Sequence, residues 1–152
     1  MPTAHYNRVK EFMKKVGQDT PDRLTTPDEK IRILRAKLIL EEAIETVHAL
    51  GVEVRAGGEK GPPIEEKSLH YSAPGEVDVD EVVDGCADIS VVTIGTLIAF
   101  GVDDEPVLEE VDESNLRKFE PGSYSREDGK WIKPPGWTPP DIKAAINRGN
   151  GY

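Results

Sequence analysis

Two long segments of this 152-residue chain combine helical periodicity with acidic residues on faces that are otherwise apolar. The first is expected to form a helix over about residues 27–50, starting at Thr26 and Pro27 and stopping at Gly51. The second is expected to form a helix over about residues 78–101. A carboxylate on a buried helix face is costly unless its charge is compensated. These two segments therefore restrict the fold to one that supplies such compensation.

In the first segment, three glutamates continue an apolar stripe. Successive residues of a helix are about 100° apart, so Glu41, Glu42 and Glu45 fall within one arc of about 100°. Leu34 and Leu38 occupy the same arc one or two turns earlier. A solvated face would surround the glutamates with lysine, serine and glutamine instead. The pattern predicts that these glutamates face other charged groups.

The second segment repeats this arrangement. Glu81, Asp84 and Asp88 stand at positions i, i+3 and i+7, so they share an arc of about 60° on a helix. From Ile89 to Phe100 the sequence is apolar nearly all round, which is typical of a buried helix. These carboxylates are therefore expected to enter or border the core.

Carboxylates that face one another across two helices cannot all stay ionised in a dry environment. Either some of them are protonated or a hard cation lies between them. Oxygen-only ligands select Mg²⁺ or Mn²⁺ over zinc or copper. Each cluster alone is more typical of a solvated helix face, but its repetition on two helices favours the cation. The sequence thus predicts an acidic Mg²⁺ site between the two long core helices.

Composition excludes several other functions. Acidic residues outnumber basic ones 29 to 19, and the net charge of -10 argues against binding of a nucleic-acid backbone. Cys86 is the only cysteine, so the chain forms no intrachain disulfide and no cysteine-built zinc site. The N-terminal sequence MPTAHYNRVKEFMKKVG lacks the apolar run of a signal peptide, and no apolar stretch has the length of a membrane span. We expect a cytoplasmic protein with neither nucleic-acid nor membrane partners.

The rest of the chain predicts shorter helices and two irregular regions. The additional helices are expected at residues 5–16, 105–118 and 139–148. Residues 52–77 are rich in glycine and proline and show no periodicity, so they predict an irregular insertion loop. Residues 120–141 predict an extended, turn-rich tail. Together these features indicate a single all-α domain over residues 1–152, built as a four- to five-helix bundle.

With these motifs in order, the sequence resembles the all-α nucleoside triphosphate pyrophosphohydrolases of the MazG-like superfamily, in particular their phosphoribosyl-ATP-pyrophosphohydrolase-like branch. The signature of that group is ExxE followed one helix later by ExxD. The residues Glu42 to Glu45 match its first half, and Glu81 to Asp84 match its second half. The stretch EEVDESNLRKF resembles the third motif of the branch, and EDGKWIKPPGWTPPDI resembles its C-terminal segment. The resemblance covers nearly the whole chain except residues 52–77.

The resemblance implies attack of water on a nucleoside triphosphate, which gives a nucleoside monophosphate and pyrophosphate. Bound Mg²⁺ would neutralise phosphate charge and lower the pKa of water. The implied metal ligands are Glu42, Glu45, Glu81, Asp84 and Asp88. The implied base or water-orienting group is Glu41 or Glu45. The implied phosphate-binding residues are Asn115, Lys118, Lys130 and Lys133, although lysines without such a motif are usually plain surface residues.

The sequence departs from the pattern of the branch at two places. The branch often has histidine where Asp112 stands, so any role of that histidine does not carry over. Asp88 precedes the long apolar run as the motif aspartate usually does, but Gly85 stands where a glutamate is expected. Asp84 and Asp88 therefore both stay candidate ligands.

Three functions stay open on the sequence alone. The first is an NTP pyrophosphatase for house-cleaning or control of a dNTP pool, and the second is hydrolysis of phosphoribosyl-ATP in histidine synthesis. The third is a non-catalytic helical metal-binding module. The non-catalytic module is disfavoured because the sequence supplies, besides the candidate metal ligands, an additional carboxylate that can act as a base and cationic groups that can bind phosphate. The insertion at residues 52–77 and the tryptophan-rich tail disfavour the second.

Two further expectations concern packing. The apolar surface of the two long helices exceeds what the short helices can cover, so we expect a homodimer or a dimer of dimers. Trp131 and Trp137 either stack on a nucleobase or pack the tail against the bundle.

Overall fold

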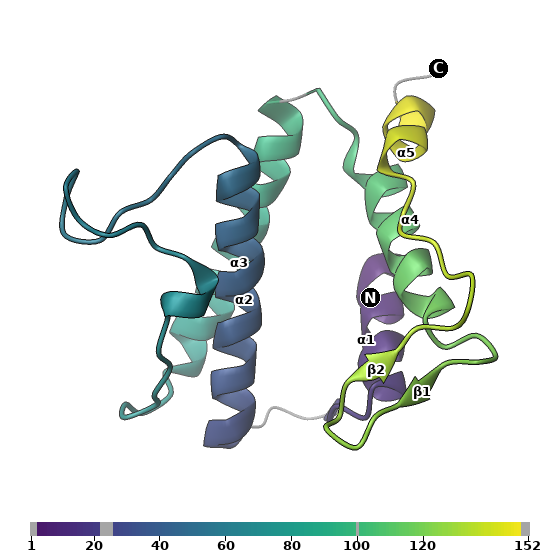
Figure 1. Cartoon of the computed structure of the whole chain (residues 1–152), viewed down its shortest axis with the longest axis horizontal. Helices are drawn as coiled ribbons and strands as arrows, with labels where there is room; N and C mark the ends of the chain where they lie inside the picture. Colours follow the sequence, from purple (N-terminus) through teal and green to yellow (C-terminus); the bar gives the residue numbers. More distant parts are fainter. Residues whose placement is uncertain (1–2, 22–25, 100, 150–152) are drawn as a thin grey trace. The chain divides into compact units, whose positions relative to one another are not determined.

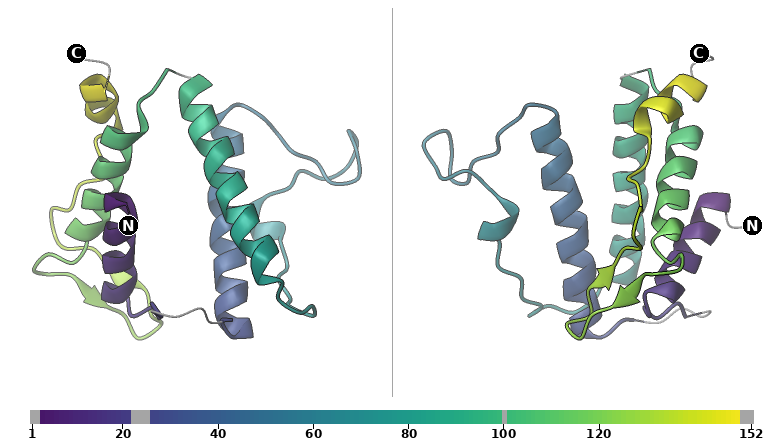
Figure 2. Two further views of the ribbon diagram at one scale, coloured as in Figure 1. Left: turned by 180° about the vertical axis from the view of Figure 1, so that it is seen from behind. Right: turned by 45° about the vertical axis from the view of Figure 1, so that its right-hand side comes forward.

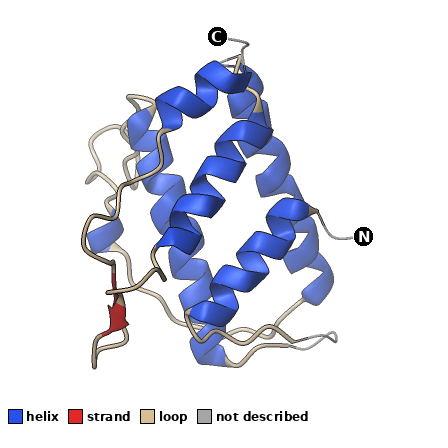
Figure 3. Cartoon of the chain, turned by 90° about the vertical axis from the view of Figure 1, so that its right-hand side faces the viewer, coloured by secondary structure: helices blue, strands red, loops and turns tan. Residues whose placement is uncertain are grey.

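The computed structural model describes residues 3–21, 26–99 and 101–149, and almost all of its regular structure is helical (Figure 3). In chain order the elements are α1 (Ala4–Lys15), α2 (Glu29–Ala49), the short 3₁₀ helix η1 (Glu66–Ser68), α3 (Val79–Ala99), α4 (Asp104–Arg117), β1 (Tyr124–Ser125), β2 (Trp131–Ile132) and α5 (Ile142–Gly149). The predicted all-α class is confirmed, with helix bounds within a few residues of those expected. None of the described helices is long and apolar enough to cross a membrane.

The chain divides into two compact units, and each is described by itself. The first unit comprises Met1–Arg23 and Asp80–Tyr152, and the second comprises Leu24–Val79. The first unit contains α1, α4, α5, the two strands and nearly all of α3. The second contains α2, η1 and the irregular segment that was predicted as an insertion. The single domain expected over residues 1–152 stays a prediction.

Local capping chemistry sets the start of the helices. The Oγ1 atom of Thr3 accepts a hydrogen bond from the backbone N–H of Tyr6 at 3.1 Å and caps α1. The Oδ1 atom of Asp28 accepts from the N–H of Ile31 at 2.8 Å and caps α2. The start predicted at Thr26 is therefore two residues too early, because the Asp28 carboxylate satisfies the free N–H groups of the first turn.

The helices α1 and α5 both pack against α4 (Figures 1 and 2). Asp112 and Ser114 of α4 are buried, as is Ala145 of α5. The Oδ2 atom of Asp112 lies 2.9 Å from Nε of Arg8 and 2.7 Å from Nδ1 of His5, both in α1. These charge-assisted hydrogen bonds join α1 to α4.

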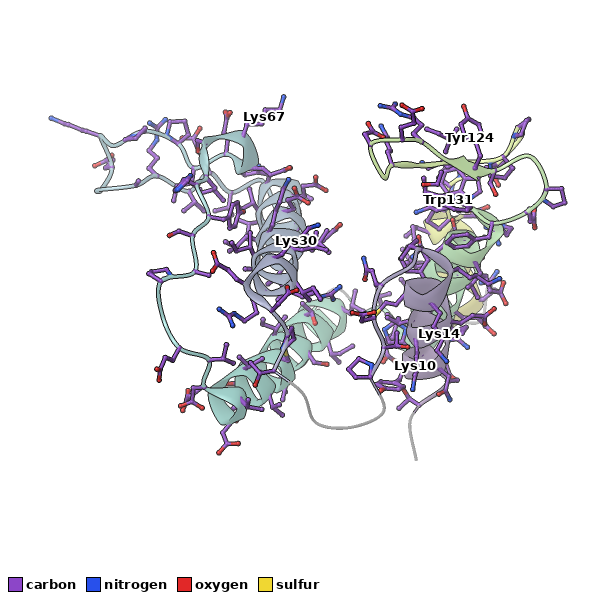
Figure 4. All side chains as sticks on the ribbon, turned by 90° about the horizontal axis from the view of Figure 1, so that it is seen from below. Lys10, Lys14, Lys30, Lys67, Tyr124 and Trp131 are labelled. Atoms are coloured by element: carbon purple, nitrogen blue, oxygen red, sulfur yellow. The ribbon has the colours of Figure 1, made fainter. Side chains whose placement is uncertain are left out.

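The tail predicted as extended contains a small hairpin. Strands β1 and β2 pair antiparallel, with Tyr124 opposite Ile132. In the turn between them, Gly129 adopts a φ of 82°, a left-handed conformation that favours glycine. Tyr124 and Trp131 lie together on this hairpin (Figure 4). Strands of two residues are too short to show the alternation that predicts a strand.

Both tryptophans anchor the tail on α4. The indole Nε1 of Trp131 donates to the backbone carbonyl of Lys118 at 2.8 Å. The Nε1 of Trp137 donates to the carbonyl of Ser114 at 3.0 Å. The second of the two expectations, packing of the tail against the helices, is the one that the structure shows.

The second unit consists of α2 and an irregular segment that folds beside it. Residues 52–77 contain η1 and an isolated antiparallel bridge between Arg55 and Pro63, in agreement with the predicted irregular insertion. The turn η1, which carries Lys67, packs beside α2 (Figure 4). Between the helix and the segment lies an open groove of about 290 Å³, whose apolar lining includes Ile44 and Ile64.

The apolar stretch of α3 is only partly described. Ile89 and Val91 are exposed in the single chain, and burial of this helix stays a prediction. Phe100 lies outside the described residues, as do the side chains of Val92, Gly95, Thr96, Ile98 and Ala99. Exposure of large aliphatic side chains on a helix leaves an apolar surface that a further copy of the chain could cover.

Candidate functional site

The three predicted glutamates of α2 differ in their surroundings. The side chain of Glu41 is 22% exposed, and its Oε1 lies 3.6 Å from Nζ of Lys37 one turn earlier. Glu42 and Glu45 are exposed. Glu41 therefore has a partly screened position with one lysine nearby, whereas Glu42 and Glu45 are available to a ligand from solution.

The insertion adds a fourth glutamate to this face, which the sequence analysis missed. A hydrogen bond between the side chains of Glu66 and Glu41 raises the pKa of Glu66. Partial loss of hydration and the negative charges of Glu41 and Glu45 raise the pKa further, while Lys37 opposes the rise. Negative charge on this face thus exceeds what the nearby cation compensates.

The acidic residues predicted on the second long helix lie on successive turns of α3. Glu81, Asp84 and Asp88 are all exposed. Because α3 and α2 belong to different units, the two acidic faces are described separately. Neither Asp84 nor Asp88 is favoured over the other by its surroundings, so both stay candidate ligands.

The donor set of the two faces fits a hard cation. Every candidate ligand is a carboxylate, which is the type of group that Mg²⁺ and Mn²⁺ prefer. The hydrogen bond to Glu41 and the negative charges of Glu41 and Glu45 raise the pKa of Glu66, as expected where carboxylates lie close together. No three acidic, histidine or cysteine side chains within the described ranges gather closely enough to hold a metal ion. A metal site built from both faces therefore stays a prediction.

Three of the four predicted phosphate-binding residues lie together at the C-terminal end of α4. The Nζ atom of Lys118 donates to Oδ1 of Asn115 at 2.8 Å. The same Nζ lies 5.6 Å from the ring centroid of Trp137, and the Nζ of Lys133 lies 4.0 Å from that centroid. The structure thus brings two ammonium groups to one aromatic ring, and one of them donates to the amide oxygen of Asn115.

The fourth candidate, Lys130, is placed differently. It is an exposed residue in the turn of the hairpin, and its backbone N–H donates to Oδ1 of Asp128 at 3.2 Å. Its role in phosphate binding stays a prediction.

The buried Asp112 also explains one departure from the pattern of the branch. Its carboxylate binds Arg8 and His5 inside the first unit. A carboxylate that is 5% exposed and occupied by two partners holds helices together rather than facing a substrate.

Comparison with solved structures gives the class of the fold. A protein from Exiguobacterium sp. 255-15, proposed to be an NTP pyrophosphohydrolase, matches 99% of this chain and 98% of its own, with a TM-score of 0.70 and 24% identity. This likeness shows a shared all-α fold. A search of curated protein sequences found no match.

A sequence-family model gives the family. The model for phosphoribosyl-ATP pyrophosphohydrolases matches residues 9–115, and the chain belongs to this family. The matched range includes the acidic turns of α2 and α3 and ends at Asn115. Family membership supports pyrophosphohydrolase activity for this protein.

Proposed function

We propose that the protein hydrolyses a nucleoside triphosphate to a nucleoside monophosphate and pyrophosphate in a Mg²⁺-dependent reaction, for house-cleaning or control of a dNTP pool. The observation that carries this proposal is the group of carboxylates on α2, where Glu42 and Glu45 are exposed beside the half-buried Glu41. In a member of a pyrophosphohydrolase family, such a face is suited to cations that accompany a triphosphate.

The candidate ligands would hold Mg²⁺, with Mn²⁺ as a substitute. They are Glu42 and Glu45 of α2 and Glu81, Asp84 and Asp88 of α3. When bound, the ion supplies positive charge that neutralises the phosphates and lowers the pKa of water. Proton transfer and phosphate binding are carried out by side chains of the protein.

Proton transfer is assigned to the α2 face. As the water oxygen bonds to the α- or β-phosphorus, the bond from that phosphorus to the oxygen bridging the two phosphates breaks, and the bridging oxygen keeps the electron pair. Glu41 or Glu45 accepts the proton of the water. The Oε1 of Glu41 lies 3.6 Å from the Nζ of Lys37. Asn115, Lys118 and Lys133 donate to phosphate oxygens, as amide and ammonium groups do. Lys130 is a weaker candidate for the same role.

Phosphoribosyl-ATP is the second candidate substrate, because the family model carries its name. The bond broken and the groups required are the same for both substrates. A panel of nucleoside triphosphates, deoxynucleoside triphosphates and phosphoribosyl-ATP with Mg²⁺ tests the proposal. Chromatography should show a monophosphate and pyrophosphate from at least one of them. Release of inorganic phosphate alone, or no turnover of any compound, would refute the proposed reaction and favour a non-catalytic metal-binding module.

We also propose a homodimer or a dimer of dimers and a cytoplasmic location. The assembly is supported by the exposed aliphatic side chains of α2 and α3. The cytoplasmic location is supported by the single cysteine, Cys86.

A further inference from the structure

One aromatic ring in the first unit carries two ammonium groups. The Nζ of Lys133 lies 4.0 Å from the centroid of Trp137, which places the charge against the ring. The Nζ of Lys118 lies 5.6 Å from the same centroid and 6.0 Å from that of Phe12. Lysine reaches these positions from two distant parts of the chain, the end of α4 and the segment after β2. The ring of Trp137 is therefore a point at which two segments of the chain each bring an ammonium group.

Two hydrogen bonds hold the indole ring of Trp137 in place. Its Nε1 donates to the carbonyl of Ser114 at 3.0 Å, and Ser114 is 1% exposed. The backbone N–H of Trp137 donates to the carbonyl of Pro134 at 3.1 Å, which closes a turn through Gly136, whose φ is 80°. Pro134 is buried. The indole therefore has a defined position on α4 rather than a freely rotating one.

A fixed ring changes what the two lysines can do. A lysine side chain has four rotatable bonds and a strongly hydrated head, so an isolated surface lysine is poorly ordered. The face of an indole attracts an ammonium group and limits the positions that it samples. Lys118 is restricted further by its hydrogen bond to Asn115. Two ordered ammonium groups at one ring match two neighbouring phosphates in a way that a single lysine does not.

We propose that Trp137 is a positioning residue, whose ring holds Lys118 and Lys133 together as a paired site for two adjacent phosphates. The inference rests on the proposed function and specifies which part of the substrate is held: the pyrophosphoryl group that leaves. It requires no contact between the ring and the nucleobase. Inorganic pyrophosphate alone should therefore bind to this site in the full chain.

Two substitutions separate the ring from its hydrogen bond. Trp137→Phe keeps an aromatic face but loses the bond to Ser114, whereas Trp137→Leu loses both. Calorimetric titration with inorganic pyrophosphate should show affinity reduced about tenfold in Trp137→Leu and within about threefold of wild type in Trp137→Phe. If Trp137 acts only through its hydrogen bond, the two variants weaken binding equally, and this result would overturn the proposal. Unchanged binding in both variants would overturn it as well.

Trp131→Leu is the matched control. Trp131 also donates through its indole to a carbonyl of α4, but its ring packs against Phe119, with centroids 4.8 Å apart. This variant should lower the melting temperature and leave pyrophosphate affinity within about threefold of wild type. A loss equal to that of Trp137→Leu would mean that tail docking alone decides binding, against the proposal.

A spectroscopic measurement on the unmodified chain covers the case in which Trp137→Leu does not fold. A group over an indole face has ring-current-shifted resonances, so the ε-methylene protons of Lys133 should resonate upfield of those of Lys130, and pyrophosphate should perturb them. Chemical shifts of Lys133 that equal those of an exposed lysine and do not change when pyrophosphate is added would overturn the proposal.

Pyrophosphate binding is measured separately from turnover. Wild-type binding without hydrolysis of any triphosphate refutes the proposed reaction alone, whereas turnover with unaltered binding in Trp137→Leu refutes the positioning role alone.

Discussion

Arg8 of α1 donates through Nε to the buried Oδ2 of Asp112 in α4 at 2.9 Å. The two residues are 104 positions apart in the sequence, so this bond closes a long loop of the chain. His5 reaches the same oxygen from one turn earlier at 2.7 Å. Asp112 is 5% exposed, whereas the side chain of Arg8 is 25% exposed. The carboxylate is therefore the member of the pair that depends on its partner for solvation.

Replacing Asp112 with alanine should lower the free energy of unfolding by about 3 kcal/mol, because the substitution leaves Arg8 without its carboxylate and opens a gap under α1. Urea denaturation of the two proteins measures the difference. Glu113→Ala is the control, since Glu113 is the exposed neighbour in the same helix and should change stability by less than about 0.5 kcal/mol. Equal losses in the two variants would show that the ion pair contributes nothing specific.

The hydrogen bond between Arg8 and Asp112 is a contact that the sequence alone does not predict. Helical periodicity located α2 and α3 to within a few residues, because the pattern is local. The pairing of Arg8 with Asp112 has no local signature, since both are ordinary polar positions until α1 packs on α4. Glu66 was missed for a related reason: the insertion has no periodicity that would assign its glutamates to a face. The contact between Glu41 and Glu66 became visible only with the path of the chain.

For the candidate phosphate-binding residues too, the sequence predicted which residues matter but not how they lie in the fold. A resemblance to known motifs selected Asn115, Lys118 and Lys133, and they lie together around Trp137. The same resemblance selected Lys130, an exposed residue of the hairpin whose role in phosphate binding stays a prediction. The resemblance selects residues by motif, whereas their convergence on one ring follows from the folded path of the tail.

Glu110 should make folding stability depend on pH in the acid range. Its carboxylate accepts a hydrogen bond from the backbone N–H of Asp141 at 2.9 Å, and this bond, with Arg148 and Arg117, holds the pKa of Glu110 below its usual value of 4.5. A group whose pKa is lower in the folded state stabilises the fold above its unfolded pKa, and the contribution is lost as pH falls through the folded pKa. The stabilisation is thus complete near neutrality and disappears below about pH 4.5.

Glu110→Gln should accordingly melt at a lower temperature than wild type at pH 7, and the two melting curves should converge as pH falls below 4.5. Thermal melts across this range measure the difference. Glu109→Gln, an exposed neighbour, should follow wild type at every pH. A gap between Glu110→Gln and wild type that stays constant down to the lowest pH would contradict the assigned cause.

Mg²⁺ should raise the melting temperature, because an ion that binds only the folded state stabilises it by mass action. Glu45→Gln should melt slightly above wild type in EDTA, since it removes a negative charge beside Glu41 and Glu66. It should also lose the Mg²⁺-dependent rise. Absence of any shift in wild type at millimolar Mg²⁺, even with a nonhydrolysable nucleotide present, would argue strongly against a metal site on these faces.

Light scattering should give the mass of a dimer or a tetramer at micromolar concentration, because Leu34, Ile39 and Leu40 of α2 are exposed in the single chain. A monomer mass would refute the predicted assembly.

Mixing Glu45→Gln with Lys133→Ala subunits tests whether the sites are shared between subunits. Recovered activity would support sharing, and its absence with demonstrated heterodimers would confine each site to one chain.

Pyrophosphate release from nucleoside triphosphates in the presence of Mg²⁺, compared between wild type and Glu45→Gln, tests the proposed reaction most directly. Glu53→Gln is the matched control, because Glu53 is an exposed glutamate of the same unit and pairs with Arg55 at the surface. We expect wild type and Glu53→Gln to release a monophosphate and pyrophosphate at similar rates, and Glu45→Gln to be slower by at least about a hundredfold while its helical circular dichroism persists. Wild-type turnover in Glu45→Gln would contradict the assignment of the acidic face of α2 to catalysis.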